Sequence, residues 1–352
     1  MMKKIVLTGG GTAGHVTPNL ALLPGLKNLG LEIHYIGTRK GIEYNLVNKE
    51  EVPYHVICAG KLRRYFDLKN LTDIFRIGMG FLQSLLLMFK LRPALVFSKG
   101  GFVSCTVVWA AWVCRIPVVI HESDITPGLA NKLSSPFAKR ICFSFPETEK
   151  HLPESKRVQT GLPIRESLFD GSASKGKELC GFGDDKPVIL VMGGSQGSQA
   201  INKAVRAALD KLLPDFNVCH LCGKGGTAPG GRKGYCQFEY VNEELPHLLA
   251  TADLAISRSG ATTLFEFLAL KKPNLLIPLG TGASRGDQIL NARSFENLGY
   301  SRVLLQDDLD TSALVENVKK LHDERDRYIR SMSQNDARAS REKVIGVLKN
   351  FI

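Results

Sequence analysis

Side chains able to take up a proton stand where two short apolar runs of this sequence end. The run Ile5–Leu7 leads into a glycine cluster that is followed at once by His15, an unusual place for a bulky titratable side chain. The run Pro117–Ile120 ends at His121 and Glu122. Imidazole and carboxylate groups commonly act as general acids and bases in enzymes, so both places are candidates for proton transfer.

Two glycine clusters could bind an anion. Residues 9–14 read GGGTAG and match the pattern G-x-G-x-x-G, and residues 193–197 read GGSQG. Glycine lets the main chain approach a ligand closely, and a helix that begins after the cluster offers free N–H groups, which stabilise a diphosphate by roughly 1 kcal/mol or more. The first match alone is weak, because a dinucleotide-binding domain should have a carboxylate after its second strand, and Arg39 stands there instead.

Groups that suit a nucleoside sugar lie further along the chain. Residues 257–266 read SRSGATTLFE and place Glu266 among apolar neighbours, where a carboxylate is costly unless it has a partner. The two hydroxyl groups of a ribose would be such a partner. Residues 285–292 read RGDQILNA and open a helix with Gln288, whose amide both donates and accepts, as sugar hydroxyls require.

The elements that must position these residues follow a regular alternation. Strand-length apolar runs that end in Gly or Ser alternate with helical patterns, which predicts α/β domains with doubly wound parallel sheets. The alternation breaks in a polar stretch near 160–187 and then begins again. We therefore expect two domains, residues 1–161 and 162–334, with the boundary near Gly161–Arg165. A C-terminal helix at about 335–352 is expected to cross back to the first domain.

Charge and cysteine usage narrow the class of protein. Residues 1–161 hold 21 Lys and Arg against 11 Asp and Glu, whereas residues 162–352 hold 25 against 23, so an anionic partner is expected for the first half. Cys219 and Cys222 have the CxxC spacing of a metal or redox pair, but no second pair follows at zinc-ribbon spacing. We therefore read Cys219 as part of a strand, and the eight cysteines as reduced thiols of a cytosolic protein.

Taken together, the motifs resemble those of the MurG family, the undecaprenyl-diphospho-muramoylpentapeptide β-N-acetylglucosaminyltransferases. The likeness runs over nearly the whole chain and the motifs keep the family order. Two loops depart from the commonest family pattern: the first reads GTAGH rather than GTGGH, and the later one reads HESD rather than HEQN. The motifs are GGGTAGH (9–15), SKGGFVS (98–104), HESDITPGLANK (121–132), GLPIR (161–165), GGSQGS (193–198), SRSGATTLFE (257–266) and GDQILNA (286–292).

The resemblance implies a GT-B fold, in which two Rossmann-like domains face each other across a cleft. The second domain would bind the UDP-sugar, with Glu266 on the ribose, Arg165 near the diphosphate and Gln288 facing the donor sugar. The first domain would face the membrane and bind the lipid-linked acceptor. The implied donor-binding residues are Arg165, Gly194, Ser195, Gln196, Gly197, Ser259, Glu266, Asp287 and Gln288, and the implied acceptor-binding residues are Thr12, Gly14, His15, Gly100, Gly101, His121 and Asn131.

The activity implied is the inverting transfer of GlcNAc from UDP-GlcNAc to the 4-hydroxyl of MurNAc in the lipid I acceptor, which gives lipid II for peptidoglycan. We predict His15 as the general base that takes the hydroxyl proton, with Glu122 as the alternative. The Asp-x-Asp motif that holds Mg²⁺ in many glycosyltransferases is matched only at Asp308-Leu309-Asp310, which reads as a helix cap. We therefore predict no obligatory metal and no cofactor.

Residues 61–92 combine basic and apolar side chains in a way that suits the surface of an anionic membrane. An apolar stripe edged with Lys and Arg can lie in the membrane interface, although a helix buried in the core would show similar residues. The longest apolar stretch, Ile77–Phe89, is too short to cross a bilayer, which needs about 20 residues. The expected location is the cytoplasmic face of the cell membrane, as a peripheral protein. The basic residues are Lys61, Arg63, Arg64, Lys69, Arg76, Lys90 and Arg92, and the acidic ones are Asp67 and Asp73.

Three other readings remain open. A GT-B transferase of another lipid acceptor, such as a diacylglycerol, would carry similar donor motifs. An NADP-dependent oxidoreductase could use the first glycine cluster with Arg39, but it leaves the second cluster and Glu266 without a role. A nucleic-acid-binding protein would explain the basic first half, yet the chain has no recognisable basic and aromatic binding motif, and we expect no nucleic acid partner.

Overall fold

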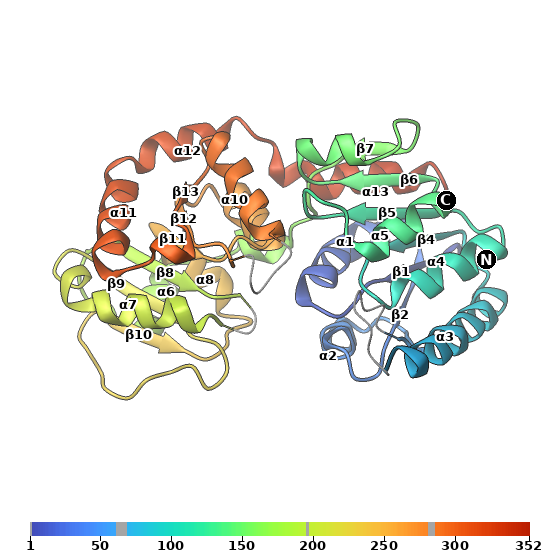
Figure 1. Ribbon diagram of the computed structural model, residues 1–352, viewed down its shortest axis with the longest axis horizontal. Coiled ribbons are helices and arrows are strands. Elements are labelled where there is room, and N and C mark those ends of the chain that lie inside the picture. The colour runs from blue at the N-terminus through green and yellow to red at the C-terminus, as the bar shows by residue number, and fades with distance from the viewer. Residues whose placement is uncertain (1, 61–68, 195–196, 281–285) are drawn as a thin grey trace. The chain divides into compact units, whose positions relative to one another are not determined.

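The chain forms two compact α/β units. The computed structural model describes residues 2–60, 69–194, 197–280 and 286–352, without the side chains of residues 69–72. The first unit comprises Met1–Arg165 together with Arg338–Ile352, and the second comprises Glu166–Ala337. Each unit has its own sheet with helices on both faces (Figure 1). The C-terminal residues 338–352 therefore pack with the beginning of the chain.

The sheet of the first unit has seven parallel strands in the order β3-β2-β1-β4-β5-β6-β7. Its central strands β1, β4 and β5 are buried, apart from Lys4 at the start of β1, because helices cover both faces of the sheet. Between β1 and β4 the strand order reverses, and open α/β sheets bind ligands beside such a reversal. The strands are β1 (Lys4–Thr8), β2 (Glu32–Gly37), β3 (Tyr54–Val56), β4 (Leu95–Ser98), β5 (Val118–Glu122), β6 (Arg140–Phe143) and β7 (Arg157–Gln159).

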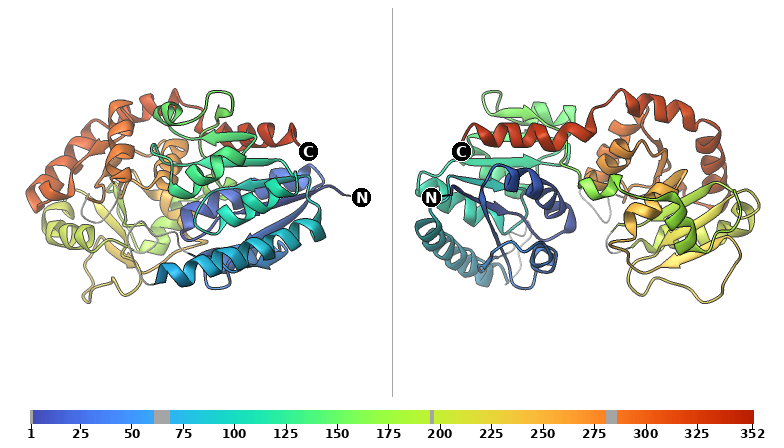
Figure 2. Two further views of the ribbon diagram at one scale, coloured as in Figure 1. Left: turned by 45° about the vertical axis from the view of Figure 1, so that its right-hand side comes forward. Right: turned by 180° about the vertical axis from the view of Figure 1, so that it is seen from behind.

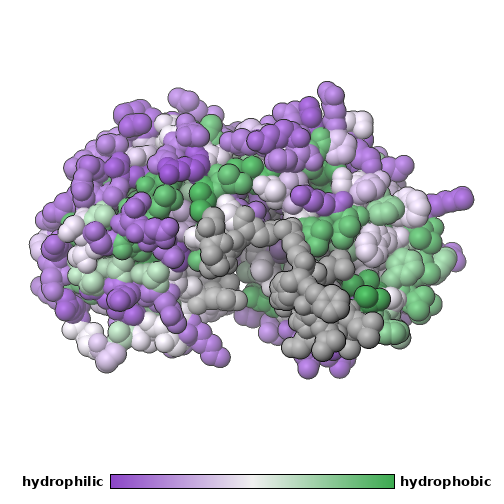
Figure 3. Space-filling view, in the orientation of Figure 1, coloured by the Kyte–Doolittle hydropathy of each residue, from purple (hydrophilic) through white to green (hydrophobic). Residues whose placement is uncertain are grey.

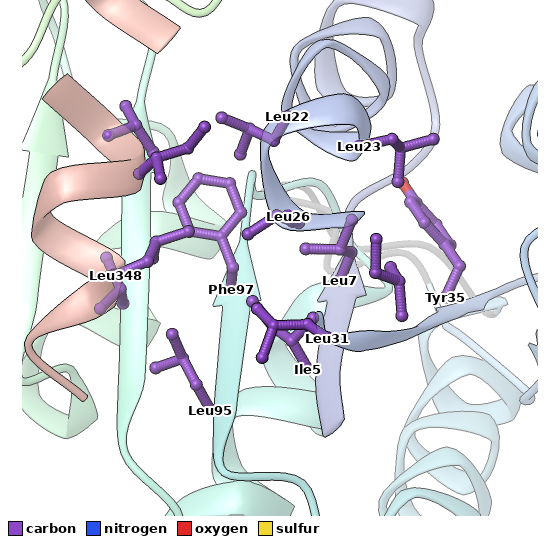
Figure 4. Close-up of a cluster of buried hydrophobic side chains, with 14 of the residues drawn as sticks. Ile5, Leu7, Leu22, Leu23, Leu26, Leu31, Tyr35, Leu95, Phe97 and Leu348 are labelled. Carbon is purple, nitrogen blue, oxygen red and sulfur yellow. The ribbon is translucent and has the colours of Figure 1, made fainter. Parts of the chain in front are cut away.

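Two helices far apart in sequence cover one face of this sheet. Leu22 and Leu26 of α1 (Thr17–Asn28) and Leu348 of α13 (Ser340–Lys349) share one buried cluster with Leu7 and Phe97 of the sheet (Figure 4). Both views of Figure 2 show α13 lying along the first unit. Burial of these side chains joins the end of the chain to its beginning.

The opposite face is covered by helices from the middle of the first unit. Met88 of α3 (Lys69–Leu91) and Val107 of α4 (Ser104–Val113) belong to a second buried cluster, which includes Val96 and Ile120 of the sheet. The shorter helices of this unit complete the connections. They are η1 (Ala13–His15), α2 (Ile42–Val47), η2 (Asn48–Glu50), α5 (Leu129–Ser134), η3 (Ser135–Phe137) and η4 (Pro146–His151).

The second sheet repeats the first with six parallel strands, in the order β10-β9-β8-β11-β12-β13. Its reversal lies between β8 and β11, which places the cluster 193–197 and the segment that begins at Arg258 at the edge where a ligand is expected. The prediction of two doubly wound parallel sheets is confirmed. The strands are β8 (Val188–Met192), β9 (Asn217–Leu221), β10 (Tyr235–Phe238), β11 (Leu254–Ser257), β12 (Asn274–Leu276) and β13 (Arg302–Val303).

Helix ends in the second unit are fixed by side-chain caps. Ser172, Ser198 and Asp310 each accept a main-chain N–H from the first turn of the helix that follows them. Gly181 ends α6 in the left-handed conformation that favours glycine. The helices are η5 (Glu166–Phe169), α6 (Ala173–Cys180), α7 (Gln199–Leu212), α8 (Leu245–Thr251), α9 (Ala261–Leu270), α10 (Asp287–Asn297), η6 (Gln306–Asp308), α11 (Thr311–Asp323), α12 (Arg325–Ser333) and η7 (Ala337–Ala339).

Candidate functional site

The loops after β1 and β4 interlock at the reversal of the first sheet. The amide of Gly10 donates to the carbonyl of Gly100 at 3.4 Å. A Cβ on Gly101 would lie 2.1 Å from the carbonyl oxygen of Gly10, and Gly101 has φ +86°, so only glycine fits there. The predicted acceptor residues Gly100 and Gly101 thus lie against the first glycine cluster.

A buried carboxylate that the sequence reading missed occupies the first glycine cluster. Glu43 of α2 accepts the amide of Gly11 at 3.1 Å and the amide of Thr38 at 3.2 Å. Its side chain also accepts the hydroxyl of Thr38 at 2.6 Å. An anion bound at Gly11 would therefore meet a negative charge where a dinucleotide-binding loop offers a free N–H. This arrangement counts against the reading as an NADP-dependent enzyme.

His15 follows this cluster in the short helix η1. Its Nδ1 lies 2.9 Å from the hydroxyl of Thr12. When this hydroxyl accepts the Nδ1 proton, Nε2 is the nitrogen that can take up a proton. Thr12 and His15, two predicted acceptor-side residues, therefore lie in contact. Their hydrogen bond can select the tautomer of His15 in which Nε2 acts as the base. Gly14 lies beside His15 in the same helix.

Glu122 is held by four hydrogen bonds at the end of β5. One carboxylate oxygen accepts the amides of Ser123 at 2.8 Å and Asp124 at 3.1 Å. The other accepts the amide of Gly128 at 3.0 Å and the side-chain NH₂ of Asn131 at 2.8 Å. A carboxylate has about four lone-pair directions, so these donors occupy them all. Burial and the charge of Asp124 raise the pKa of Glu122. These hydrogen bonds fix the main chain of residues 123–131, so Glu122 acts by positioning this loop. Because both of its oxygens are already occupied, the geometry favours His15 as the base.

Asn131 and His121 differ in what they can offer a ligand. Asn131 donates to Glu122 and to the carbonyl of His121, while its own side-chain oxygen has no partner among the described residues. A Cβ on Gly100 would lie 3.0 Å from that oxygen, which therefore sits beside the β4 loop. His121 is fully buried, and its Nε2 lies 2.9 Å from the carbonyl of Gly161. Burial, then the charge of Lys99, lowers its pKa well below the usual range. His121 is a neutral core residue here, which argues against the predicted direct contact with an acceptor.

Lys99 is a second residue that the sequence reading missed. It follows β4 directly, its side chain is 1% exposed, and its ammonium group donates to the hydroxyl of Ser123. Burial lowers its pKa to about 8, against the opposing effect of Glu122 and Asp124. Ser123 is one of the positions where the chain departs from the family pattern, and Lys99 holds it in place. A lysine that directly follows a buried strand was the available signal.

In the second unit, the glycine cluster after β8 leads into α7. Gly194 and Gly197 both have positive φ, of +85° and +74°. The amide of Gly197 donates to the carbonyl of Gly194 at 3.0 Å, and Ser198 caps α7. Among the described residues, apart from the chain neighbours of Gly194, no atom lies within 4 Å of the place where a Cβ on Gly194 would stand. A glycine turn that leads into a capped helix N-terminus is a common place for an anion to bind. Ser195 and Gln196, which were predicted to lie near the diphosphate, fall outside the described residues.

Arg258 joins the loops around this cluster, and the sequence reading gave it no role. Its guanidinium donates to the carbonyls of Ile277 at 2.9 Å and Pro278 at 3.1 Å. It also donates to the hydroxyl of Ser198 at 2.8 Å and to the side-chain oxygen of Gln306 at 2.7 Å. The planar group can reach four acceptors at once, which a lysine cannot. Arg258 thereby fixes the loops after β8, β11 and β12 relative to one another.

The remaining residues predicted for the donor side lie in helices α9 and α10 or just before α9. Ser259 is buried and its hydroxyl donates to the carbonyl of Gln288 at 2.7 Å. The side-chain oxygen of Gln288 accepts the amide of Leu279 at 3.0 Å, which fixes the direction of its amide. Asp287 is the first residue of α10. Glu266 lies in α9 and is 7% exposed, as its apolar neighbours led us to expect.

The structure also describes Arg165 and the Asp308-Leu309-Asp310 motif, two further features named from the sequence. Arg165 is half-buried and is the last residue of the first unit before the chain enters the second. The reading of Asp308-Leu309-Asp310 as a helix cap is confirmed, because Asp310 accepts the amide of Ala313 at 2.8 Å at the start of α11.

Helix α3 has an apolar face that is exposed in the part of the chain that the structure describes. Phe75, Met79, Leu82, Leu86 and Phe89 recur every three or four residues and are 51–74% exposed. Figure 3 shows apolar side chains gathered where Figure 1 places α3 and α4. The opposite face packs inward through Met88, which is 1% exposed, so the predicted stripe is divided between core and surface.

Helix α4, which packs against α3, also has exposed apolar side chains at its end. Trp112 and Val113 at the end of α4 are 54% and 50% exposed. The apolar run Ile77–Phe89 lies inside a longer segment, Asp73–Leu91, which by length and mean hydropathy could cross a membrane. Only 22% of that segment is buried, which is too little for an ordinary core helix.

Comparison with known proteins gives this site a family. Residues 5–143 match the glycosyltransferase family 28 N-terminal domain, and residues 188–346 match the glycosyltransferase family 28 C-terminal domain. A UDP-N-acetylglucosamine–N-acetylmuramyl-(pentapeptide) pyrophosphoryl-undecaprenol N-acetylglucosamine transferase of Clostridium kluyveri is 54% identical, covering 99% of this chain and all of the relative. The protein of the same name from Clostridium tetani is 50% identical, covering all of this chain and 99% of its own.

Solved structures agree on the fold. MurG from Acinetobacter baumannii has a TM-score of 0.75 at 25% identity, with 99% of each chain covered. A UDP-N-acetylglucosamine 2-epimerase has a TM-score of 0.70 at 15% identity, covering 99% of this chain and 96% of its own. Because an epimerase shares the architecture, the fold alone does not choose the reaction. The two sheets form a GT-B architecture, and the chain belongs to glycosyltransferase family 28 and, within it, to the MurG family of N-acetylglucosaminyltransferases.

Proposed function

We propose that this chain transfers GlcNAc from UDP-GlcNAc to the 4-hydroxyl of MurNAc in a lipid-linked muramoyl-peptide acceptor, with inversion at the anomeric carbon. The observation that carries the proposal is the identity of 50–54% over the full length to transferases with this name. The glycine clusters at the reversal points of both sheets support it, since each unit then has an edge suited to one of the two substrates.

On the donor side, the second unit binds the nucleotide. The glycine turn after β8 and the N-terminus of α7 bind the diphosphate, whose negative charge grows as the sugar leaves. Glu266 accepts the hydroxyl groups of the ribose, and Asp287 and Gln288 face the sugar. Arg165 neutralises the leaving group. Arg258 touches no substrate in this proposal; its four hydrogen bonds keep Ser198, at the N-terminus of α7, in position relative to the loops after β11 and β12.

On the acceptor side, His15 removes the proton from the attacking hydroxyl. Thr12 accepts the Nδ1 proton, which leaves Nε2 to act as the base. Glu122 and Lys99 act as positioning residues that fix the loop 123–131. The unpartnered side-chain oxygen of Asn131 is placed to accept a hydroxyl or amide proton of the acceptor.

The acceptor's lipid stays in the membrane, and the enzyme lies on the cytoplasmic face with α3 in the interface. Five exposed apolar side chains at helical spacing form one stripe, and Arg76, Lys90 and Arg92 are exposed on the same helix and at its end. Burial of its apolar area drives such a stripe into the membrane interface. The attraction of each basic neighbour to anionic lipids adds about 1 kcal/mol. The basic residues Lys61, Arg63 and Arg64 fall outside the described residues.

The activity is tested by transfer of labelled GlcNAc to a lipid I analogue. We expect UDP-GlcNAc to be used and UDP-glucose and UDP-GalNAc to be poor donors. A diacylglycerol acceptor tests the second candidate in the same assay. Transfer to diacylglycerol but not to the lipid I analogue would refute the proposed acceptor, whereas failure to bind UDP would refute the donor site as well.

Membrane binding is tested by sedimentation with anionic vesicles. Phe81 and Leu85 are half-buried, so the informative change is Phe75→Asp with Leu86→Asp, whose side chains are 74% and 69% exposed. The matched control is Leu29→Asp with Leu298→Asp, at exposed positions away from α3. We expect only the first pair to lose vesicle binding. Equal binding by both pairs would refute the role of α3.

A further inference from the structure

Three cysteines from separate segments of the second unit meet in space. The sulfur atoms of Cys180, Cys219 and Cys236 all lie within 4.8 Å of one another. Cys180 is the last residue of α6, Cys219 is in the middle of β9, and Cys236 is in the edge strand β10. No part of the transfer reaction proposed above uses them. We refer to Cys180, Cys219 and Cys236 as the thiol triad.

The sheet register explains why these side chains converge. Cys236 is the direct neighbour of Cys219 in the parallel pair β9–β10, so both side chains point to the same face. Helix α6 packs against β10 and supplies Cys180. Cys222, three residues after Cys219, points to the opposite face, where its sulfur contacts Arg206 of α7 at 3.4 Å. The CxxC spacing in the sequence is therefore not the functional pair, and the true partners of Cys219 are distant in sequence.

The spacing of the triad fits a single bound cation. A zinc–sulfur bond is about 2.3 Å long, so three sulfur ligands of one Zn²⁺ lie about 3.8–4.0 Å apart. Sulfur atoms that already lie within 4.8 Å need to move by no more than about 1 Å to reach this geometry. Cys219 is buried, whereas Cys180 and Cys236 are half-buried, so one ligand lies in the core and a cation can reach the other two from solvent.

Metal binding by the triad has a chemical consequence that can be measured. The thiolate is the form of cysteine that binds a metal ion, so thiol protons must leave for solvent when the cation binds.

We propose that the thiol triad of α6, β9 and β10 binds one thiophilic cation, Zn²⁺, through three sulfur ligands, with a water molecule in the fourth position. Soft thiolate ligands select Zn²⁺ and Cu⁺ over Mg²⁺ or Ca²⁺. The ion ties the end of α6 to the edge strand of the second sheet and stabilises this unit. This role is separate from sugar transfer, for which we still predict no metal.

The test measures Zn²⁺ binding by the whole chain, kept reduced with a phosphine and stripped of metal with a chelator. We expect one Zn²⁺ per chain in competition with a chromophoric chelator, and sulfur-to-metal charge-transfer absorption when Co²⁺ replaces Zn²⁺. Cys180→Ser and Cys236→Ser should each weaken Zn²⁺ binding by more than about 100-fold, because loss of even an outer-shell partner costs 10–100-fold. Cys222→Ser is the matched control and should bind as the native chain does.

Wild-type protein provides a second measurement that does not depend on how the variants fold. Zn²⁺ should protect Cys180, Cys219 and Cys236 from alkylation, as read by mass spectrometry, and leave the exposed Cys58 reactive. It should also raise the unfolding temperature of the native chain and of Cys222→Ser, but not of Cys180→Ser. Absence of stoichiometric binding, or protection of Cys222 instead of the triad, would overturn the proposal.

Discussion

Replacing Glu122 with Gln separates the two roles that a carboxylate at this position could have. The native side chain accepts four hydrogen bonds, two on each oxygen, from residues 123, 124, 128 and 131. Gln keeps one oxygen and puts an NH₂ group in place of the other. Whichever way the amide turns, two of the four N–H donors then face the NH₂ group of Gln instead of an oxygen atom. If Glu122 is a positioning residue, the loop must loosen; if it is the general base, the loop stays and only the proton transfer is lost.

The size of the effect follows from those bonds. A hydrogen bond to a charged group contributes about 1.5–3 kcal/mol, so two lost bonds cost about 3–6 kcal/mol. Burial raises the pKa of Glu122, so the charged form is itself costly, and removing the charge offsets part of the loss. We expect a net cost of about 3 kcal/mol, which corresponds to a change of about 100-fold in the opening equilibrium of the loop.

Hydrogen exchange read by mass spectrometry measures this opening directly. Peptides that cover residues 123–128 should exchange about 100-fold faster in Glu122→Gln, while peptides from β8 and α7 should be unchanged. Turnover should fall in parallel, without a shift in its pH profile. The control is His15→Ala, which should leave this exchange unchanged. Native exchange at 123–128 together with lost turnover in Glu122→Gln would refute the positioning role and return Glu122 to the mechanism as the base.

Three further changes test other parts of the argument. His15→Ala should cut turnover by about 100-fold or more while UDP still binds by calorimetry, since general-base catalysis contributes about 10²–10⁴-fold; unchanged turnover would remove His15 from the mechanism. Arg258→Lys should weaken UDP binding at least about tenfold, because a point charge cannot replace four directed hydrogen bonds, and native affinity would contradict its positioning role. Burial, then the charge of Arg206, lowers the pKa of His220 to about 4. Because the folded state holds the neutral ring while the unfolded chain takes up a proton near pH 6.5, the free energy of unfolding falls as the pH drops from about 6.5 toward 4. In urea unfolding the second unit should lose about 2 kcal/mol between pH 7 and 5, and His220→Gln should lose much less; equal losses would exclude His220 as the cause.

What the sequence predicts well is what depends on local pattern. Apolar runs of strand length followed by glycine predicted both parallel sheets, and Asp310 was correctly read as a helix cap. The burial of Glu266 followed from its apolar neighbours in the same helix. These features need only near neighbours in the chain, so a single sequence carries enough information to find them.

What the sequence did not predict depends on contacts between distant segments. Glu43 reaches Gly11 across 32 positions, and Arg258 gathers acceptors from residues 198 to 306. In the same way, Cys219 meets its sulfur partners from α6 and β10 rather than at the CxxC spacing. No local pattern distinguishes such a side chain from an exposed one. His121 is the reverse case: its place at the end of a strand suggested a contact with the acceptor, whereas β5 is buried along its whole length and His121 lies in the core.

The two glycine clusters show why like sequence patterns can have unlike functions. Both follow a central strand at the reversal of a parallel sheet, and both have glycines with positive φ. In the first, Glu43 already accepts the amide of Gly11, so a phosphate there would face a carboxylate across a short distance. In the second, no described residue beyond the chain neighbours of Gly194 approaches its Cβ position, and the guanidinium of Arg258 lies at Ser198, where α7 begins. We therefore expect the diphosphate of the donor nucleotide to bind at the second cluster rather than at Gly11, because an anion is attracted by N–H groups and positive charge and is repelled by a carboxylate.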